Sequence, residues 1–162
     1  MGRIDSDAGG GRGSPFRTWS IAVLTLSLMV AGCSIPRWPA EGTMTSPFGL
    51  RWSGLLPVVH RGVAIAMPTG TPVRAMAPGS VRFAGAMAGY GEVVWLDHPR
   101  GTLTVYAHLD EIRVNTGAAV SHREVIGLSG ATGIVSGPHL HFEVWVAGRP
   151  VDPVRYLGGF PR

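Results

Sequence analysis

The stretch GPHLHFEVWV, residues 137–146, alternates polar and apolar side chains from His139 onward. Successive side chains of a β-strand point to opposite faces, so this alternation predicts a half-buried strand. One face carries His139, His141 and Glu143, and the other carries Leu140, Phe142, Val144 and Val146. We therefore expect a hydrophobic core on one side of this strand. On its other side, two neighbouring imidazoles face a cleft or solvent.

The rest of the chain consists of short apolar runs separated by turn signals. Pro78 and Gly79 divide residues 71–85, and a second turn signal at 99–101 divides residues 91–109. With 24 glycines and 13 prolines among 162 residues, the chain favours short strands joined by tight turns. No window keeps a helical period beyond one turn at 152–157. These features predict a compact all-β domain over residues 43–157, followed by a C-terminal tail at 158–162.

The composition indicates a folded domain with a core and argues against a phosphate-binding loop. Hydrophobic residues make up 45% of the chain and charged residues 15%, which is enough apolar side chain for a real core. The net charge is +4, and every basic residue is an arginine. A phosphate loop of the Walker type needs a lysine, so that class is excluded. The arginine excess could attract anionic lipid or cell-wall polymer, and it is equally often a solvated face. We expect no nucleic-acid partner.

The first 32 residues have the pattern of a signal peptide. Three arginines precede the uncharged run at 20–32, which ends in small residues. This run is shorter than the about 20 residues that span a bilayer. Cys33, the only cysteine, follows in VAGCS, which resembles the bacterial lipobox. We expect a lipidated N-terminus at Cys33, a tether over 33–42, and an exported lipoprotein anchored in a membrane, at the outer membrane or periplasm of a diderm cell. The alternative is a small hydrophobic residue that merely ends the signal peptide.

Two further histidines lie near the ends of predicted strands. His60 heads the apolar run at 58–68, and His108 closes the run TLTVYAHL, residues 102–109. Strict alternation would place Tyr106 and His108 on one face of that strand, opposite Val105 and Ala107. A lone histidine on a strand is more often structural, but several on polar faces favour a metal, because imidazole is the usual ligand of zinc. His98 and His122 lie beside turn-like stretches and are predicted at the surface.

The order of motifs resembles the lysostaphin/LytM-type zinc metalloendopeptidases. From about Thr45 to Leu157 the chain carries SPFGLR, HRGVAIAMPTGTPV, APGSV, GYGEVV, YAHL, GATG, GPHLHFEV and VDPVRYL. The resemblance implies an antiparallel, sandwich-like β-sheet with a groove in which peptidoglycan peptides are cut. It implies zinc ligands at His60, position 64 and His141. It also implies catalytic roles for His108 and His139, in activating water and stabilising the oxyanion.

The chain departs from this family pattern at position 64, where the expected aspartate is Ala64. A methyl group cannot bind zinc, so two neutral nitrogen ligands remain without their anionic partner, and zinc binding is expected to be weak or absent. Glu143 is two residues beyond His141, about 7 Å along a strand, and is a poor substitute. Asp97 and Asp110 are the other carboxylates considered, and rescue by any of them is not expected. A second departure, Arg123-Glu124 in place of Gly-Gln, falls in a predicted surface turn.

The favoured function is a lipid-anchored, non-catalytic domain in peptidoglycan remodelling, which binds wall peptides or activates a cell-wall amidase. The first alternative is a working zinc endopeptidase for cross-link peptides with a substitute ligand. The second is a structural lipoprotein whose groove binds nothing. Position 64 is the feature that separates a pseudoenzyme from an enzyme.

Overall fold

The computed structural model describes residues 35–53 and 55–161. The predicted signal peptide and Cys33 lie outside the described residues, so those predictions remain predictions. The elements are β1 (Thr43–Ser46), β2 (Gly49–Ser53), β3 (Leu56–His60), β4 (Val63–Ala66), β5 (Pro72–Arg74), β6 (Gly79–Met87), β7 (Gly91–His98), β8 (Thr102–Ile112), β9 (Ala119–Val120), β10 (Val125–Ser129), β11 (His139–Val146), β12 (Arg149–Val151) and α1 (Pro153–Tyr156), with a 3₁₀ turn at Pro99–Gly101.

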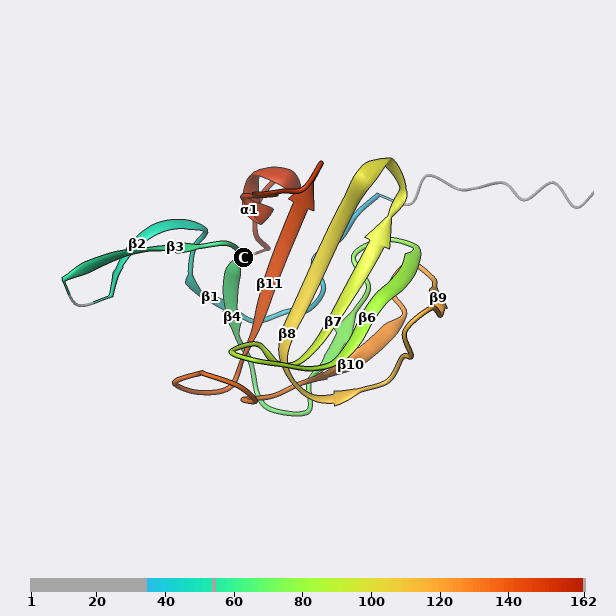
Figure 1. Ribbon diagram of the computed structural model, residues 1–162, viewed down its shortest axis with the longest axis horizontal. Coiled ribbons are helices and arrows are strands. Elements are labelled where there is room, and N and C mark those ends of the chain that lie inside the picture. Colours follow the sequence, from blue (N-terminus) through green and yellow to red (C-terminus); the bar gives the residue numbers. More distant parts are fainter. Residues whose placement is uncertain (1–34, 54, 162) are drawn as a thin grey trace, which may run out of the picture. The chain divides into compact units, whose positions relative to one another are not determined.

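The strands form one large antiparallel sheet and a separate hairpin. The large sheet runs β1-β4-β11-β8-β7-β6-β9, with β12 on β11 and β10 pairing both β8 and β5. The hairpin consists of β2 and β3 and extends away from the sheet (Figure 1). The prediction of an all-β, antiparallel fold is confirmed.

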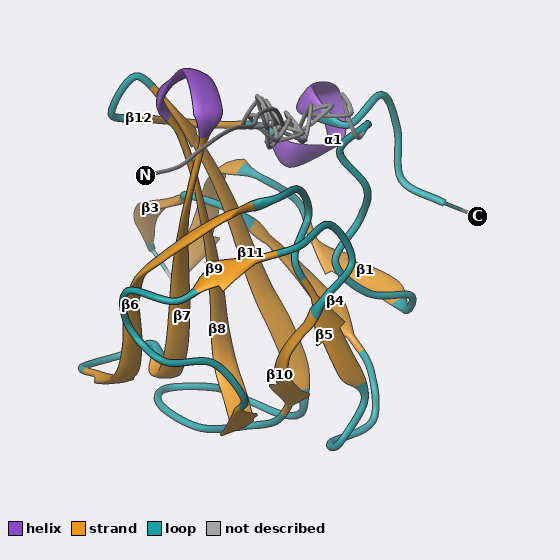
Figure 2. Ribbon diagram, turned by 90° about the vertical axis from the view of Figure 1, so that its right-hand side faces the viewer, coloured by secondary structure: helices purple, strands orange, loops and turns teal. Residues whose placement is uncertain are grey.

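The main core lies between the long strands and a second layer of short strands. It contains Phe142 from β11 and Tyr106 from β8, with Val73 from β5 and Ile126 from β10, all fully buried. Figure 2 shows β5, β9 and β10 in front of the long strands β7, β8 and β11. The alternation predicted for residues 139–146 is confirmed, because the even-numbered side chains of β11 pack into this core.

The packed part of the chain extends beyond the predicted domain limits at both ends. Trp38, expected in the tether, is 8% exposed; its ring centroid lies 6.0 Å from that of Phe142 and 4.6 Å from that of Phe160. Its indole N–H donates to the carbonyl of Gly159 at 2.6 Å. The expected tether and the expected tail therefore pack on each other. The reason is that burying the large apolar surface of a tryptophan side chain stabilises this contact.

Among residues 35–53 and 55–161, the one α-helix is the short turn predicted near the C-terminus. Asp152 caps α1 by accepting a hydrogen bond from the Val154 N–H at 2.9 Å, and Pro153 occupies the first turn. Aspartate before proline is a favourable helix start, which explains why this segment is helical. Within the described ranges, no helix has the length and apolar character needed to cross a bilayer.

The surface prediction for His98 is wrong. Its ring is buried, with Nδ1 2.9 Å from the carbonyl of Pro78 and Nε2 2.7 Å from the hydroxyl of Thr104. The backbone of Gly79 lies against this ring, where a Cβ would approach the imidazole to 2.9 Å. The absence of a side chain at Gly79, the first residue of β6, thus allows the sheet to cover His98. The turn-like sequence around His98 had suggested an exposed position. His122, also predicted at the surface, is half-buried.

Candidate functional site

A cleft of about 620 Å³ lies where β3 ends and meets β4, β8 and β11. It is lined by the four histidines named from the sequence, His60, His108, His139 and His141. Their positions along the chain span 81 residues between His60 and His141, so only the sheet pairing brings them together. The cleft is therefore a site assembled by tertiary structure from residues that the sequence identified separately.

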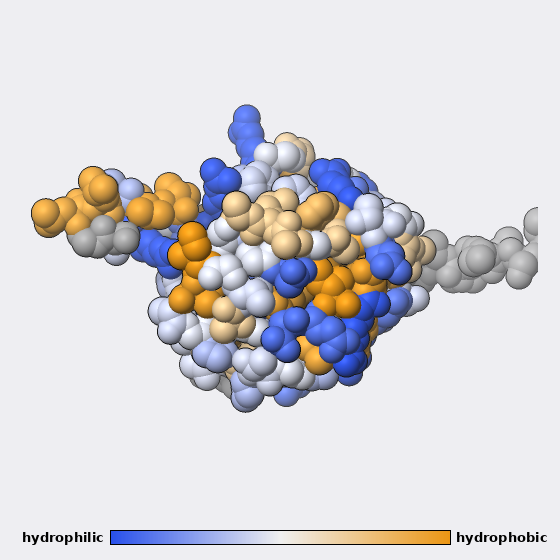
Figure 3. All heavy atoms as spheres, turned by 60° about the horizontal axis from the view of Figure 1, so that its bottom comes forward, coloured by the Kyte–Doolittle hydropathy of each residue, from blue (hydrophilic) through white to orange (hydrophobic). Residues whose placement is uncertain are grey.

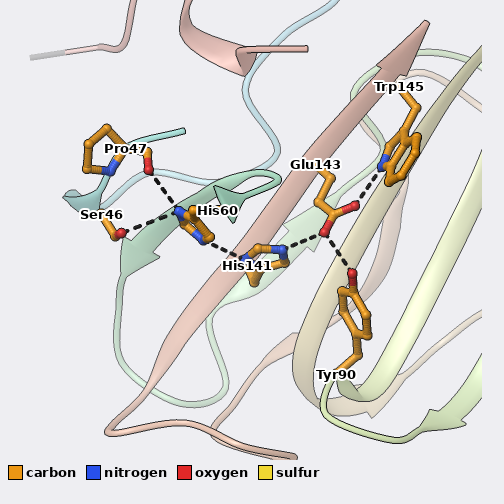
Figure 4. Close-up of polar contacts among 7 residues, drawn as sticks. All are labelled: Ser46, Pro47, His60, Tyr90, His141, Glu143 and Trp145. Carbon is orange, nitrogen blue, oxygen red and sulfur yellow. Dashed lines mark hydrogen bonds and ion pairs between the residues drawn. The ribbon is translucent and has the colours of Figure 1, made fainter. Parts of the chain in front are cut away.

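His60 and His141 face each other directly. The Nδ1 of His60 lies 2.8 Å from the carbonyl of Pro47, which can only accept, so this nitrogen carries the proton. Its Nε2 is then the acceptor, and it lies 3.1 Å from Nδ1 of His141 (Figure 4). Ser46 Oγ approaches the same Nδ1 of His60 at 3.3 Å. Burial is the main cause that lowers the pKa of His60, which agrees with a neutral ring in this position.

The other nitrogen of His141 is paired with a buried carboxylate. Nε2 of His141 lies 2.8 Å from Oε1 of Glu143, a residue that is 1% exposed. Glu143 also accepts from the Tyr90 hydroxyl at 2.9 Å and from the Trp145 indole at 2.6 Å. Burial by itself would raise the pKa of Glu143, but the donors of His141, Trp145 and Tyr90 outweigh it and the pKa is lowered. Three side chains, His141, Tyr90 and Trp145, therefore converge on one carboxylate.

The residues of the cleft do not fit the zinc ion that its histidines suggest. Two nitrogens bound to one tetrahedral zinc at 2.0–2.1 Å would be about 3.3–3.4 Å apart, close to the 3.1 Å observed. The third ligand is lacking, because Ala64 stands directly opposite His141 in the β4–β11 pairing. Among the described residues that line the cleft, Glu143 is the sole carboxylate, and it binds the far side of the His141 ring. Across the same described ranges, no cluster of three suitable ligands occurs.

His108 and His139 form a second pair on the cleft wall. Their ring centroids are 4.8 Å apart, and each Nδ1 donates to a backbone carbonyl, of Thr132 and Gly137 respectively, at 2.9 Å. In the neutral form of either ring, Nε2 is the acceptor. Burial lowers the pKa of His108 to about 4, so this ring is a neutral group at ordinary pH. The two rings could accept hydrogen bonds from a ligand in the cleft.

The predicted grouping of Tyr106 with His108 is wrong because β8 is not regular there. Tyr106 packs in the main core with Phe142, whereas Ala107 pairs with His141 and belongs to the cleft face. His108 has φ 63°, a left-handed conformation that is uncommon for a residue other than glycine. The pairing of β7 with β8 shifts register at the same place. This bulge turns His108 onto the face of Ala107, and strict alternation could not reveal it.

Sequence reasoning missed the role of Tyr90. Its ring centroid lies 5.8 Å from that of His141, and its hydroxyl holds Glu143. Proximity to Glu143 and burial raise its pKa to about 12, with burial the larger cause, so it stays a donor. The carboxylates considered as substitutes are elsewhere: Asp97 pairs with Arg82 at 2.7 Å, and Asp110 is exposed and does not line the cleft.

Comparison with known proteins relates this chain to a peptidase family. The model of peptidase family M23 matches residues 58–153, more than half of the chain. The DD-carboxypeptidase/endopeptidase Mpg of Neisseria meningitidis is 45% identical over 113 residues, which are 68% of this chain and 26% of Mpg. The uncharacterized lipoprotein YgeR of Escherichia coli is 33% identical over 74% of this chain and 46% of YgeR. A crystal structure of a zinc-containing peptidase from Vibrio cholerae is 36% identical, with a TM-score of 0.69, over 74% of this chain and 39% of that one. The chain thus spans less than half the length of each of these three proteins.

Proposed function

Because the chain belongs to peptidase family M23, we propose that it is an exported, lipid-anchored domain that binds peptidoglycan without cutting it. The name of Mpg, a DD-carboxypeptidase/endopeptidase, supports an activity on peptides, and the name of YgeR supports a lipoprotein. The name of a further relative, the peptidoglycan DD-endopeptidase ShyA of Vibrio cholerae, supports peptidoglycan as the target. We further propose that the domain acts through a protein partner, a cell-wall amidase whose activity it promotes. Cys33 is the proposed site of lipidation.

The observation that carries the non-catalytic assignment is the methyl group of Ala64 opposite His141. Deleting a hydrogen-bonding partner of a zinc ligand already weakens metal binding by about 10- to 100-fold, so deleting an anionic ligand should cost more. In place of a shared zinc ion, His60 and His141 can share a hydrogen bond, as the 3.1 Å distance between Nε2 of His60 and Nδ1 of His141 indicates. The cleft then retains its histidines as hydrogen-bonding groups for a bound peptide.

The β2–β3 hairpin supports a protein partner. Its side chains are exposed to an unusual degree: Leu50 69%, Trp52 70%, Leu55 95%, Leu56 71% and Val59 60%. Figure 3 shows hydrophobic residues gathered on an arm that projects from the body. Arg51 and Val59 of the same hairpin line the cleft. Exposed apolar patches of this kind mark interaction sites, so we place the amidase on the hairpin and the wall peptide in the cleft beside it.

Binding and hydrolysis of purified peptidoglycan test the proposal. The full-length protein is expected to sediment with intact sacculi and to release no soluble muropeptides, with or without added zinc. Addition of the protein to a cell-wall amidase is expected to increase hydrolysis, and Leu55→Ser with Leu56→Ser should remove that increase while sacculus binding persists. Zinc-dependent release of muropeptides that His141→Ala abolishes would overturn the non-catalytic assignment.

The lipid anchor is tested by mass spectrometry of the mature N-terminus. Diacylglycerol and a fatty acid on Cys33 are expected, with Cys33→Ser as the matched control that leaves the signal peptide uncleaved at this position. A mature chain that begins at another residue would refute the anchor without affecting the proposed peptidoglycan binding.

A second candidate function, a zinc endopeptidase with a substitute ligand, is favoured by one observation. Nε2 of His60 and Nδ1 of His141 are separated by 3.1 Å, near the about 3.3–3.4 Å that two ligands of a tetrahedral zinc would have. Metal analysis of the purified protein decides between the two functions, since one zinc per chain supports the peptidase.

A further inference from the structure

A second hollow, of about 490 Å³, lies on the same face of the large sheet as the cleft. It shares Arg61, Tyr90 and Glu143 with the cleft, so the two hollows are adjacent. The shared residues form the boundary between them. The remaining lining residues come mainly from β6, β7, β8 and β11 and include Arg82, Met87, Trp95, Asp97, Leu103, Val105 and Trp145.

The strand register builds the floor of this hollow in two rows. Val105 of β8 pairs with Glu143 on one side and Trp95 on the other, so these three side chains share a face. The next row joins Leu103 to Trp145 and Asp97 in the same way. Rows on one face are about 7 Å apart along the strands. Trp145 is four residues beyond His141, so it lies about 13 Å from the histidine cleft along β11.

Three aromatic side chains, Tyr90, Trp95 and Trp145, line the hollow, and the two indoles are held in place. The indole of Trp145 is fixed by its 2.6 Å hydrogen bond to Glu143. Trp95 packs edge-on against Phe83, with ring centroids 6.4 Å apart. Its indole N–H is buried and finds no hydrogen-bond partner among the described residues. A ligand in the hollow therefore meets the exposed part of this ring and not its nitrogen.

The charges around the hollow are balanced. Arg82 and Asp97 form a paired contact, with N–O distances of 2.8 and 2.7 Å, on the rim. The guanidinium of Arg61 lies 6.0 Å from the ring centre of Trp145, and Glu143 is already paired with His141. Two arginines therefore face two carboxylates. This balance favours an uncharged ligand that has both an apolar face and polar groups at its edges.

We propose that this aromatic hollow is a subsite for an N-acetylated amino sugar of the peptidoglycan strand. The inference rests on the proposed function and names a second part of its ligand. Sugar rings present C–H groups that pack on indole faces, while their hydroxyls bind planar groups such as those of Arg82 and Asp97. The acetamido methyl group adds apolar contact to the indole rings of Trp95 and Trp145.

The spacing of the two hollows agrees with the covalent structure of peptidoglycan, in which the stem peptide is attached to a sugar. An extended peptide covers about 3.3–3.6 Å per residue, so four residues span the about 13 Å between Trp145 and the histidines. One strand could thus place its sugar on the tryptophans and its peptide in the cleft. Arg61 and Tyr90, which line both hollows, lie along that path.

Titration of the full-length protein with two fragments of peptidoglycan tests the subsite. One fragment is tri-N-acetylglucosamine, which has no peptide, and the other is a free stem tripeptide, which has no sugar. NMR of the indole N–H signals detects binding of each fragment. The trisaccharide is expected to shift the signals of Trp95 and Trp145. Trp145→Ala and Leu103→Arg should each raise its dissociation constant at least tenfold. Tyr156 on α1 is 39% exposed and serves as the control position. Tyr156→Ala should leave the dissociation constant of the trisaccharide unchanged.

Each result decides the inference separately from the proposed function. Shifts of the Trp95 and Trp145 signals by the tripeptide in place of the trisaccharide would overturn the sugar subsite in favour of a longer peptide groove. If neither fragment shifts these signals at millimolar concentration while intact sacculi are still bound, the subsite is refuted and the proposed function stands. If sacculi are not bound either, both are refuted. Signal dispersion of each variant shows whether it is folded.

Discussion

Replacing Ala64 by aspartate should convert the cleft into a zinc site. Ala64 lines the cleft, is 8% exposed and stands opposite His141 in the sheet, so a carboxylate at this position extends toward the two facing nitrogens. These nitrogens are separated by 3.1 Å and need to move by only a few tenths of an ångström to bind one metal. The added anion also offsets the charge of a divalent cation in a partly buried place, which two imidazoles do not.

The expected gain in zinc affinity is at least about 100-fold. Loss of a group that only hydrogen-bonds to a zinc ligand already lowers the affinity by up to that factor. Without metal, Ala64→Asp should destabilise the fold by about 1–3 kcal/mol, because it places a charge in a buried position. Zinc at 100 times its dissociation constant should then stabilise the variant by about 2.7 kcal/mol. For a domain of this size that corresponds to a rise of about 5–15 °C in Tm.

Calorimetric titration and thermal unfolding with and without zinc measure both quantities. Ala64→Asn is the matched control, because it has the same size without the charge, and it should show little of either effect. The reasoning would be wrong if the unaltered protein already held one zinc per chain, or if Ala64→Asp gained neither affinity nor a zinc-dependent rise in Tm.

Three further predictions concern stability. Glu143→Gln places an amide opposite three donors and should lower the free energy of urea unfolding by about 2–4 kcal/mol, whereas Glu41→Gln on the surface should not. Trp38→Ala should cost about 3–5 kcal/mol because it opens a cavity between the two chain ends, and an equal loss for Trp52→Ala, which is 70% exposed, would contradict that account. Burial lowers the pKa of His98, and that of His108 to about 4, from the usual 6.5. The unfolded chain then binds more protons than the folded one, so the unfolding free energy should fall as the pH decreases from 6.5 toward 4. His98→Asn should flatten part of this dependence, and a profile that stays as steep would refute the contribution of His98.

The sequence by itself determined the fold class and the composition of the cleft. Alternation over residues 139–146 identified which side chains of β11 enter the core and which face the cleft, because a strand has a period of two. The order of motifs identified the family, and the family pattern exposed Ala64 as the departure. These features are local, or depend on a comparison of residue types at fixed spacing.

Only the tertiary structure decided the orientation and the hydrogen-bond partners of the side chains in the site. The bulge that turns His108 toward the cleft depends on pairing with β7, so no property of residues 102–109 alone predicts it. Glu143 binds the far nitrogen of His141, and Tyr90 joins it from another part of the chain. The burial of His98 and the packing of Trp38 on Phe160 likewise follow from contacts between distant segments. Hydrogen bonds and packing act over a few ångströms in space, whatever the separation along the chain, and for that reason a pattern read along the sequence cannot contain them.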